Sequence, residues 1–367
     1  MSDTDRIGVL GGSFDPVHMG HLGLADAARA RAGLCQVLFM PACVQPFKQG
    51  AEMSSADDRL RMLGLALEGR PHFGVTEVEI ERGGVSYTID SLRALSAGLF
   101  GGRGAAQTAG RDDARLCFII GTDMFLMIEK WKDADALLRE FDFAVGVRPG
   151  YRHGEAVALA GRLREEYGTR IDLVDNPPLE LSSSEIRERV RSGGDICGLV
   201  PEGVRRFLLV REKVGERRFS HTKRVIDLAV DMARRFGESV EKAGLAALLH
   251  DYCKDPTGGA ENDLAHGGMA ADTAERIFGI DDEDVLNAIR FHTTGRAGMS
   301  RLEKIIFLAD TVEPGRTYNS IAELRETCLD DLDRGTLTVL VELKKYLEQK
   351  GLAVSADTEA AIEDLRK

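Results

Sequence analysis

The sequence predicts a parallel α/β domain followed by an all-helical domain. Its 367 residues exceed what one ordinary hydrophobic core contains. Up to about residue 200, short apolar runs alternate with helical patterns, which is typical of a parallel sheet with right-handed crossovers. Beyond that point only helical periodicity is found. We therefore expect two domains, spanning residues 1–212 and 213–367.

Six segments of the first domain are expected to be strands, because each is short and apolar or alternates apolar and polar residues. They are 6–10, 36–40, 73–81, 116–120, 141–147 and 171–174. Helical periodicity predicts helices over 19–32, 55–68 and 87–95. The stretch 98–114, rich in Gly and Ala, is expected to be a flexible surface insertion.

The second domain is expected to contain helices alone. Apolar residues recur with the helical period throughout it, and no segment reads convincingly as a strand. The expected helices are 204–213, 221–236, 240–250, 270–278, 282–291, 301–310, 320–329 and 337–349.

Composition limits the classes of partner. The net charge of −12 argues against binding a nucleic acid polymer but leaves small nucleotides open. No apolar run approaches the roughly 18 residues that cross a bilayer, and the acidic start resembles no signal peptide, so we expect a cytoplasmic protein with no membrane partner. The six scattered cysteines form no Cys-x-x-Cys pair and are expected to be free thiols.

A loop rich in glycine and histidine, residues 11–21, follows the first expected strand and opens a helix. Open α/β sheets bind phosphates at such positions. Gly11 and Gly12 allow the backbone to approach a ligand closely. His18 and His21 share one face of the helix start, where two imidazoles can stabilise charge on a departing pyrophosphate.

The string Gly-Gly-x-Phe-Asp-Pro-x-His-x-Gly-His resembles the His-x-Gly-His nucleotidyltransferase superfamily. Within it, residues 5–210 are similar to the bacterial nicotinate mononucleotide adenylyltransferases, through segments 86–92, 120–123, 131–132 and 181–187. The resemblance implies a Rossmann-like sheet, and catalytic roles for His18, His21, Lys48 and Arg187. It also implies substrate contacts from Gly11, Gly12, Ser13, Phe14, Ser86, Tyr87, Thr88, Gly121, Asp123, Trp131, Lys132, Arg148, Ser182, Ser183 and Ser184.

The implied reaction is adenylyl transfer from ATP, with Mg²⁺ on the triphosphate, to nicotinate mononucleotide. A flat aromatic face at Trp131 suits the pyridine ring. Phe47 departs from the family pattern, which has a histidine there, so its effect on substrate choice stays open. Transferases of the same superfamily that act on phosphopantetheine or on a sugar or lipid phosphate remain alternatives.

Four of the eight histidines, two aspartates and several cations mark the helical domain. Imidazole and carboxylate groups on facing helices are how helical bundles build metal sites. One histidine directly precedes an aspartate, and a second aspartate ends an apolar helical stretch. These residues are His221, His250, Asp251, His266, His292 and Asp310.

This set resembles the HD superfamily of metal-dependent phosphohydrolases. Within it, residues 215–365 are similar to YqeK-type HD proteins, which are described as symmetrical bis(5′-nucleosyl)-tetraphosphatases. The resemblance implies an all-α HD domain that hydrolyses diadenosine tetraphosphate to two ADP, with Asp251 also in the catalytic set. His221, His250, Asp251 and Asp310 would hold one metal, and His266 and His292 a second that shares Asp251. Lys254, Arg296 and Arg316 are candidates for gripping phosphates.

A dinuclear centre of nitrogen and oxygen ligands suits iron, manganese or zinc, and the resemblance favours iron. Another HD-class nucleotide hydrolase, or a silent module that senses metal or nucleotide, remains an alternative. The oligomeric state is left open, with a homo-oligomer among the options.

Overall fold

The computed structural model describes residues 6–44, 53–98, 116–147, 152–175, 181–255, 260–318 and 321–367. Contacts divide the chain into two compact units, Met1–Arg205 and Arg206–Lys367. The expected insertion lies outside the described residues from position 99 onward, as do Phe47, Lys48 and Arg148. None of the described helices is both long and apolar enough to cross a membrane.

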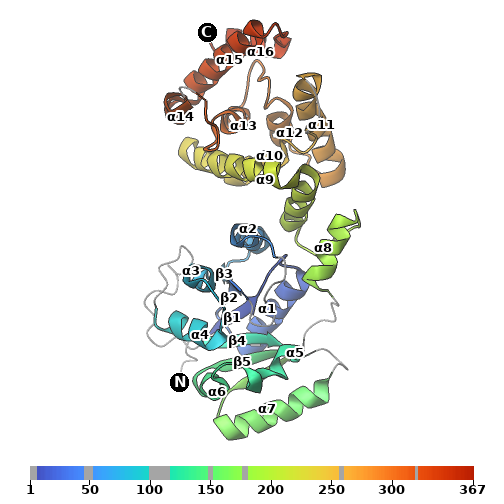
Figure 1. The fold of residues 1–367 in the computed structure, drawn as a ribbon, viewed down its shortest axis with the longest axis vertical. Helices are drawn as coiled ribbons and strands as arrows, with labels where there is room; N and C mark the ends of the chain where they lie inside the picture. Colours follow the sequence, from blue (N-terminus) through green and yellow to red (C-terminus); the bar gives the residue numbers. More distant parts are fainter. Residues whose placement is uncertain are drawn as a thin grey trace. The chain divides into compact units, whose positions relative to one another are not determined.

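The first unit is built on a six-stranded parallel sheet with the strand order β3-β2-β1-β4-β5-β6 (Figure 1). Val9 in β1 lies opposite Leu38 on one side and Phe118 on the other. The order therefore reverses beside β1, and in open α/β sheets ligands bind at the carboxyl ends of strands at such a point. The strands are β1 (Ile7–Gly12), β2 (Gln36–Pro41), β3 (Phe73–Val75), β4 (Leu116–Gly121), β5 (Asp142–Val147) and β6 (Ile171–Asp175).

Helices connect these strands, as the alternating sequence pattern predicted. A core of side chains from β1, β4 and β5 packs against side chains of three of these helices, including Leu92, Leu137 and Ala160. The connecting elements are α1 (Met19–Ala32), α2 (Ala56–Leu67), α3 (Val78–Arg82), α4 (Thr88–Ser96), α5 (Thr122–Phe125), η3 (Ile128–Lys130), α6 (Ala134–Glu140), α7 (His153–Tyr167) and α8 (Ser183–Arg191).

The segment 73–81, expected to be one strand, is a strand only to Val75, and α3 begins at Val78. Val78 and Glu79, in the first turn of this helix, are both buried. Gly83 has a positive φ of 70° and donates its backbone N–H to the Glu79 carbonyl, so it ends the short helix.

The second unit contains helices and no strand among the residues that the structure describes, which confirms the predicted fold class (Figure 1). The expected helices 204–213 and 221–236 are continuous with each other in α9, apart from Gly215, whose φ is 74°. The helix after residue 355 was not predicted. The elements are α9 (Glu202–Phe236), α10 (Val240–Leu249), α11 (Ala260–Phe278), α12 (Glu283–Arg290), α13 (Arg301–Val312), α14 (Ile321–Asp330), α15 (Leu332–Gln349) and α16 (Ala356–Asp364).

Candidate active sites

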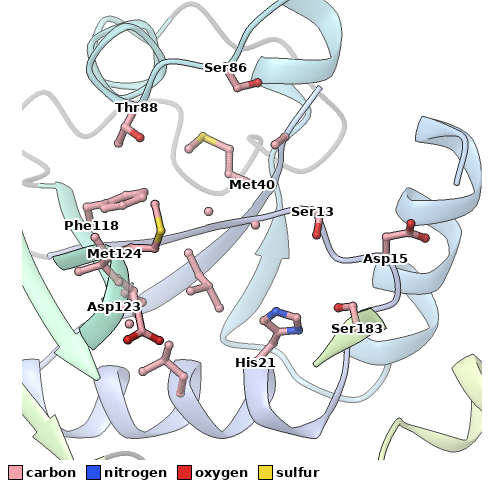
Figure 2. Close-up of a pocket in the computed structure, with 18 of the residues that line it drawn as sticks. Ser13, Asp15, His21, Met40, Ser86, Thr88, Phe118, Asp123, Met124 and Ser183 are labelled. Carbon is pink, nitrogen blue, oxygen red and sulfur yellow. The ribbon is translucent and has the colours of Figure 1, made fainter. Parts of the chain in front are cut away.

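A cavity of about 860 Å³ opens at the carboxyl ends of β1 and β4. Figure 2 shows Ser86 and Thr88 on one side of it and His21 and Ser183 on the other. Phe14 does not line the cavity and is fully buried behind it. The other predicted transferase residues that the structure describes all line it: Gly11, Gly12, Ser13, His18, His21, Ser86, Tyr87, Thr88, Gly121, Asp123, Trp131, Lys132, Ser182, Ser183, Ser184 and Arg187.

His18 and His21 lie stacked at the start of α1, with ring centroids 3.7 Å apart. The backbone N–H of His18 donates to His21 Nδ1 at 3.3 Å, so a neutral His21 carries its proton on Nε2. Burial lowers the pKa of His18 to about 4, which keeps its imidazole neutral at pH 7. His18 Nδ1 is buried and makes no hydrogen bond within the described part of the chain. His18 therefore offers a neutral ring nitrogen to a ligand.

The loop that carries these histidines is held from behind by Arg59, which was not predicted. Arg59 is 2% exposed and donates to the carbonyls of Ser13 at 3.0 Å and Ala42 at 2.7 Å. A buried arginine offers several donors in a fixed planar geometry. The backbone that faces the cavity is thereby fixed to the end of β2.

Helix α8 fixes the same loop from the other side. Ser183 Oγ donates to the carbonyl of Pro16 at 3.0 Å, and Arg187 donates to the carbonyl of Asp15. Arg187 also lies 3.6 Å from the Asp15 carboxylate, which accepts from the Ser54 N–H at 3.1 Å. Asp15 is a cavity residue that the motif analysis did not single out.

The opposite end of the cavity carries the aromatic and hydroxyl side chains. The Trp131 ring meets Phe118 edge-on at 6.0 Å, and its buried Nε1 has no hydrogen-bond partner among the residues described. Lys132 Nζ lies 4.8 Å from the centre of the Tyr87 ring. Ser86 Oγ accepts from a backbone N–H at 3.1 Å. A planar heteroaromatic ring with a polar substituent suits this end.

Glu79 is a buried acid in the cavity wall that sequence reasoning missed. It is 4% exposed and accepts a hydrogen bond of 2.6 Å from Ser91 Oγ. Ser91 Oγ also lies 3.1 Å from the carbonyl of Tyr87, so the acid is linked to the start of α4. Burial raises the pKa of Glu79.

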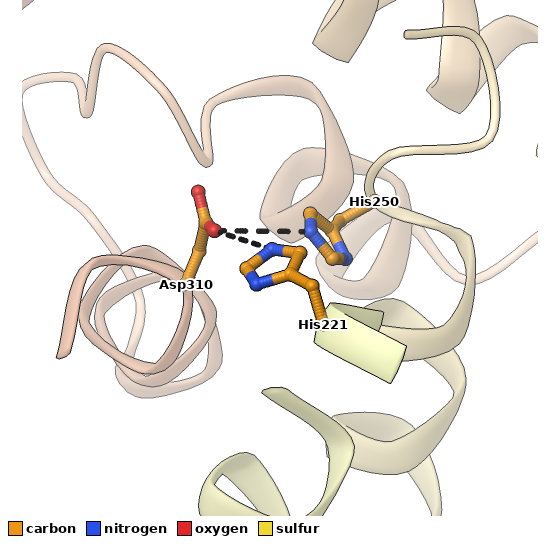
Figure 3. Close-up of side chains that lie close together, drawn as sticks. All are labelled: His221, His250 and Asp310. Atoms are coloured by element: carbon orange, nitrogen blue, oxygen red, sulfur yellow. Dashed lines mark ion pairs between the residues drawn. The ribbon is translucent and has the colours of Figure 1, made fainter. Parts of the chain in front are cut away.

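In the helical unit, three predicted metal ligands from three elements converge (Figure 3). His221 comes from α9, His250 follows α10, and Asp310 lies on α13. Asp310 Oδ1 is 3.0 Å from His221 Nε2 and 4.0 Å from His250 Nε2. These nitrogen and oxygen atoms could hold one metal ion.

The remaining three predicted ligands form an adjoining group around Asp251. Asp251 Oδ1 lies 3.1 Å from His266 Nε2 and 3.7 Å from His292 Nε2. The two imidazole nitrogens are 3.0 Å apart. Asp251 Oδ2 faces the first group, at 3.7 Å from His250 Nε2. The structure thus brings all six predicted ligands together, with Asp251 between the two groups.

The hydrogen bonds of His250 and His292 leave the Nε2 atom of each ring directed toward the place where a metal ion would bind. His250 Nδ1 donates to the carbonyl of Ala247 and His292 Nδ1 to that of Ile289, both at 2.7 Å. Burial lowers the pKa of His250 to about 4, so its Nε2 carries a lone pair. That lone pair faces carboxylates, and the buried Nε2 has no hydrogen-bond partner in the described regions. A divalent metal would relieve this repulsion.

Two of the three predicted phosphate contacts lie beside these carboxylates. Arg316 Nη2 is 2.9 Å from Asp310 Oδ1, and Lys254 Nζ is 3.6 Å from Asp251 Oδ1. Arg296 instead pairs with the buried Glu303 at 2.6 Å. The structure therefore places Arg296 in an ion pair with an acid that is not among the predicted ligands.

Two supporting side chains were missed by sequence reasoning. Glu313 lies 3.1 Å from His221 Nδ1 and accepts from Arg224 at 2.6 Å. Burial opposes its ionisation, but Arg224, a backbone N–H and His221 outweigh it and lower the pKa of Glu313 to about 2. Arg218 contacts Asp251 Oδ2 at 3.1 Å. Both lie three residues from a predicted ligand, a spacing that could have indicated them.

Close packing at the second histidine group makes Gly267 sensitive to substitution. A Cβ there would lie 2.6 Å from the carbonyl oxygen of Arg290, at the end of α12. Gly267→Ala is therefore expected to cost roughly 1–3 kcal/mol of stability by overpacking. Differential scanning calorimetry of the full chain would measure the lowered transition of the helical unit.

Gly268 is the matched control, since a Cβ there meets nothing within 4 Å. Gly268→Ala should leave stability unchanged or raise it by up to about 1 kcal/mol through helix propensity. Equal effects of the two substitutions would contradict the packing argument.

Comparison with known proteins identifies both units. A cytidylyltransferase-like family model matches residues 9–189, and an HD domain model matches residues 218–315. A solved structure from Clostridium acetobutylicum, a predicted HD superfamily hydrolase involved in NAD metabolism, is 37% identical with a TM-score of 0.42. It covers 44% of this chain and 97% of its own.

The curated relatives match the transferase portion. A probable nicotinate-nucleotide adenylyltransferase of Moorella thermoacetica is 37% identical over 206 residues, covering 56% of this chain and 90% of that protein. One from Bordetella petrii is 38% identical over 203 residues, covering 55% of this chain and 95% of that protein. With that identity over nearly the whole length of these relatives, the chain belongs to the nicotinate-nucleotide adenylyltransferase family and carries an HD domain in addition.

Proposed function

We propose that the α/β domain transfers the adenylyl group of ATP to nicotinate mononucleotide, releasing pyrophosphate and forming nicotinate adenine dinucleotide. The observation that carries this proposal is one cavity lined both by His18 and His21 and by Trp131 with residues 86–88. Figure 2 shows His21 across this cavity from Ser86 and Thr88. Family membership supports the same substrate, since the relatives are named for it.

The reaction requires no protein nucleophile. The phosphate of the mononucleotide attacks the α-phosphorus of ATP in line, and the bond to pyrophosphate breaks. His18 and His21 line this cavity and would hydrogen-bond the phosphate oxygens on which charge develops. Arg59, Ser183 and Arg187 hold the loop in one conformation through hydrogen bonds to its carbonyls. The histidines on this loop are therefore already oriented before the reaction begins. Mg²⁺ bound to the triphosphate would neutralise part of its charge.

Pyrophosphate release in the presence of ATP and Mg²⁺ tests the assignment. The protein is offered nicotinate mononucleotide, nicotinamide mononucleotide, phosphopantetheine and a sugar phosphate in parallel. We expect the highest kcat/KM with nicotinate mononucleotide. A preference for phosphopantetheine or the sugar phosphate would refute the proposal, and a preference for the amide would reassign the substrate.

We propose that the HD domain hydrolyses diadenosine tetraphosphate symmetrically to two ADP. The observation behind it is the double ligand group that meets at Asp251. His221, His250, Asp251 and Asp310 would hold one ion, and His266 and His292 a second ion shared with Asp251. Two ions of iron, manganese or zinc would supply an activated water and stabilise charge on the phosphate oxygens.

The chain's own cations complete this site. Lys254 and Arg316 lie at the carboxylates that face the two histidine groups, where they could neutralise a polyphosphate. A ligand with four bridging phosphates offers charge for both. A nucleoside monophosphate offers less negative charge to these two cations.

Product analysis after incubation with diadenosine tetraphosphate and Fe²⁺ or Mn²⁺ tests this activity. We expect ADP alone. ATP plus AMP would refute the symmetrical cut, and no cleavage of this or any other nucleotide by protein that retains its metal would favour a sensing module.

A further inference from the structure

We infer that Arg218 is a positioning residue for the HD metal centre, which holds Asp251 so that each of its carboxylate oxygens faces one histidine group. The inference rests on the proposed dinuclear centre. It concerns a residue of α9 that neither the motif analysis nor the proposed mechanism uses.

The two oxygens of Asp251 have different surroundings. Oδ1 faces His266 and His292, at 3.1 and 3.7 Å from their Nε2 atoms. Oδ2 faces His250, at 3.7 Å, and contacts Arg218 Nη1 at 3.1 Å. Asp251 is 2% exposed, so solvent offers this carboxylate little alternative.

A carboxylate that bridges two ions must keep a fixed orientation, so that each of its oxygens faces one ion. The χ2 torsion of aspartate is broad, so an unrestrained carboxylate can turn away from one of the two groups. Lys254 contacts Oδ1 at 3.6 Å, but its flexible ammonium acts as a point charge. The guanidinium of Arg218 has rigid, directional donors and contacts the other oxygen.

The position of Arg218 supports this role. It precedes His221 by three residues on α9, so the helix that supplies a ligand to the first group also supplies the restraint on Asp251. Arg218 is partly exposed at 23% for its side chain, whereas Asp251 is buried. Partners that orient metal ligands typically contribute 10–100-fold to metal affinity.

The full-length chain and three variants test the inference with Mn²⁺. Ions per chain are counted by mass spectrometry over a titration, and electron paramagnetic resonance reports whether two ions are exchange-coupled. We expect wild type to bind two coupled ions. Arg218→Gln should bind the second ion roughly 10–100-fold more weakly and lose the coupled signal, and Arg218→Lys should lie between the two. Arg217→Gln, at an exposed neighbour, should match wild type.

Equal affinity of Arg218→Gln and wild type for the second ion would overturn the positioning role, as would an equal loss in Arg217→Gln. If Arg218→Gln loses its helical circular dichroism, Arg218→Lys becomes the test variant. Weaker binding of the second ion by Arg218→Lys would support the positioning role, and binding equal to wild type would overturn it. Failure of wild type to bind two ions would overturn the dinuclear centre itself, together with this inference.

Discussion

Replacing His18 with alanine is expected to lower kcat for pyrophosphate release by a factor on the order of 10²–10³, the usual effect of removing one donor to a developing negative charge. His18 is 6% exposed and lines the cavity, with a ring nitrogen that has no hydrogen-bond partner among the described residues. The imidazole is therefore buried at a place where a ligand could reach it. Steady-state kinetics with nicotinate mononucleotide and ATP would measure the loss.

Two controls accompany this variant. His72→Ala removes an exposed histidine of the same domain and should leave kcat unchanged. Circular dichroism should show that His18→Ala keeps its secondary structure. Because the pKa of His18 lies at about 4, the imidazole of the free enzyme stays neutral from pH 6 upward. The variant's deficit should therefore persist across neutral pH, and wild-type turnover by His18→Ala would contradict the proposed role.

The fold class followed from local patterns in the sequence. Buried parallel strands are short apolar runs, and β1, β2, β4, β5 and β6 all lie where such runs predicted them. The prediction of one strand over 73–81 was wrong, because its alternating pattern did not indicate that helix α3 begins at Val78 and buries Val78 and Glu79. That burial comes from packing beside the cavity, which is a tertiary effect.

In the candidate sites, too, the motif residues were predicted, and the residues that contact them through tertiary packing were not. The motifs and the family resemblances predicted His18, His21 and six candidate metal ligands, and the structure brings each set together. Arg59 was not predictable, since its donors reach loop carbonyls 17 and 46 residues away in sequence. Arg296 follows a ligand closely in sequence, yet Glu303 holds it in an ion pair. Sequence proximity to a site did not determine the direction of a long side chain.

Asp251→Asn is expected to reduce hydrolysis of diadenosine tetraphosphate by at least about 100-fold. Replacing a residue that only orients a metal ligand typically lowers metal affinity or activity roughly 10–100-fold, and Asp251 is itself a proposed ligand. The substitution keeps the side chain's size and removes its charge. Burial opposes ionisation of Asp251, but His266, His292 and Lys254 outweigh it and hold the pKa of Asp251 well below its usual range. The native carboxylate is thus ionised at every working pH, and only the variant presents a neutral group.

Asp281→Asn, at an exposed aspartate of the same unit, is the matched control and should keep wild-type hydrolysis. The transferase provides an internal standard, since the two activities are proposed for separate compact units. Asp251→Asn should release pyrophosphate at the wild-type rate while its formation of ADP from the tetraphosphate falls by the factor given above. Hydrolysis at the wild-type rate in this variant would show that the ligand group around Asp251 is not where the tetraphosphate is cleaved. A parallel loss of transferase activity would instead point to a defect of the whole chain, because the transfer reaction is proposed for residues of the other unit.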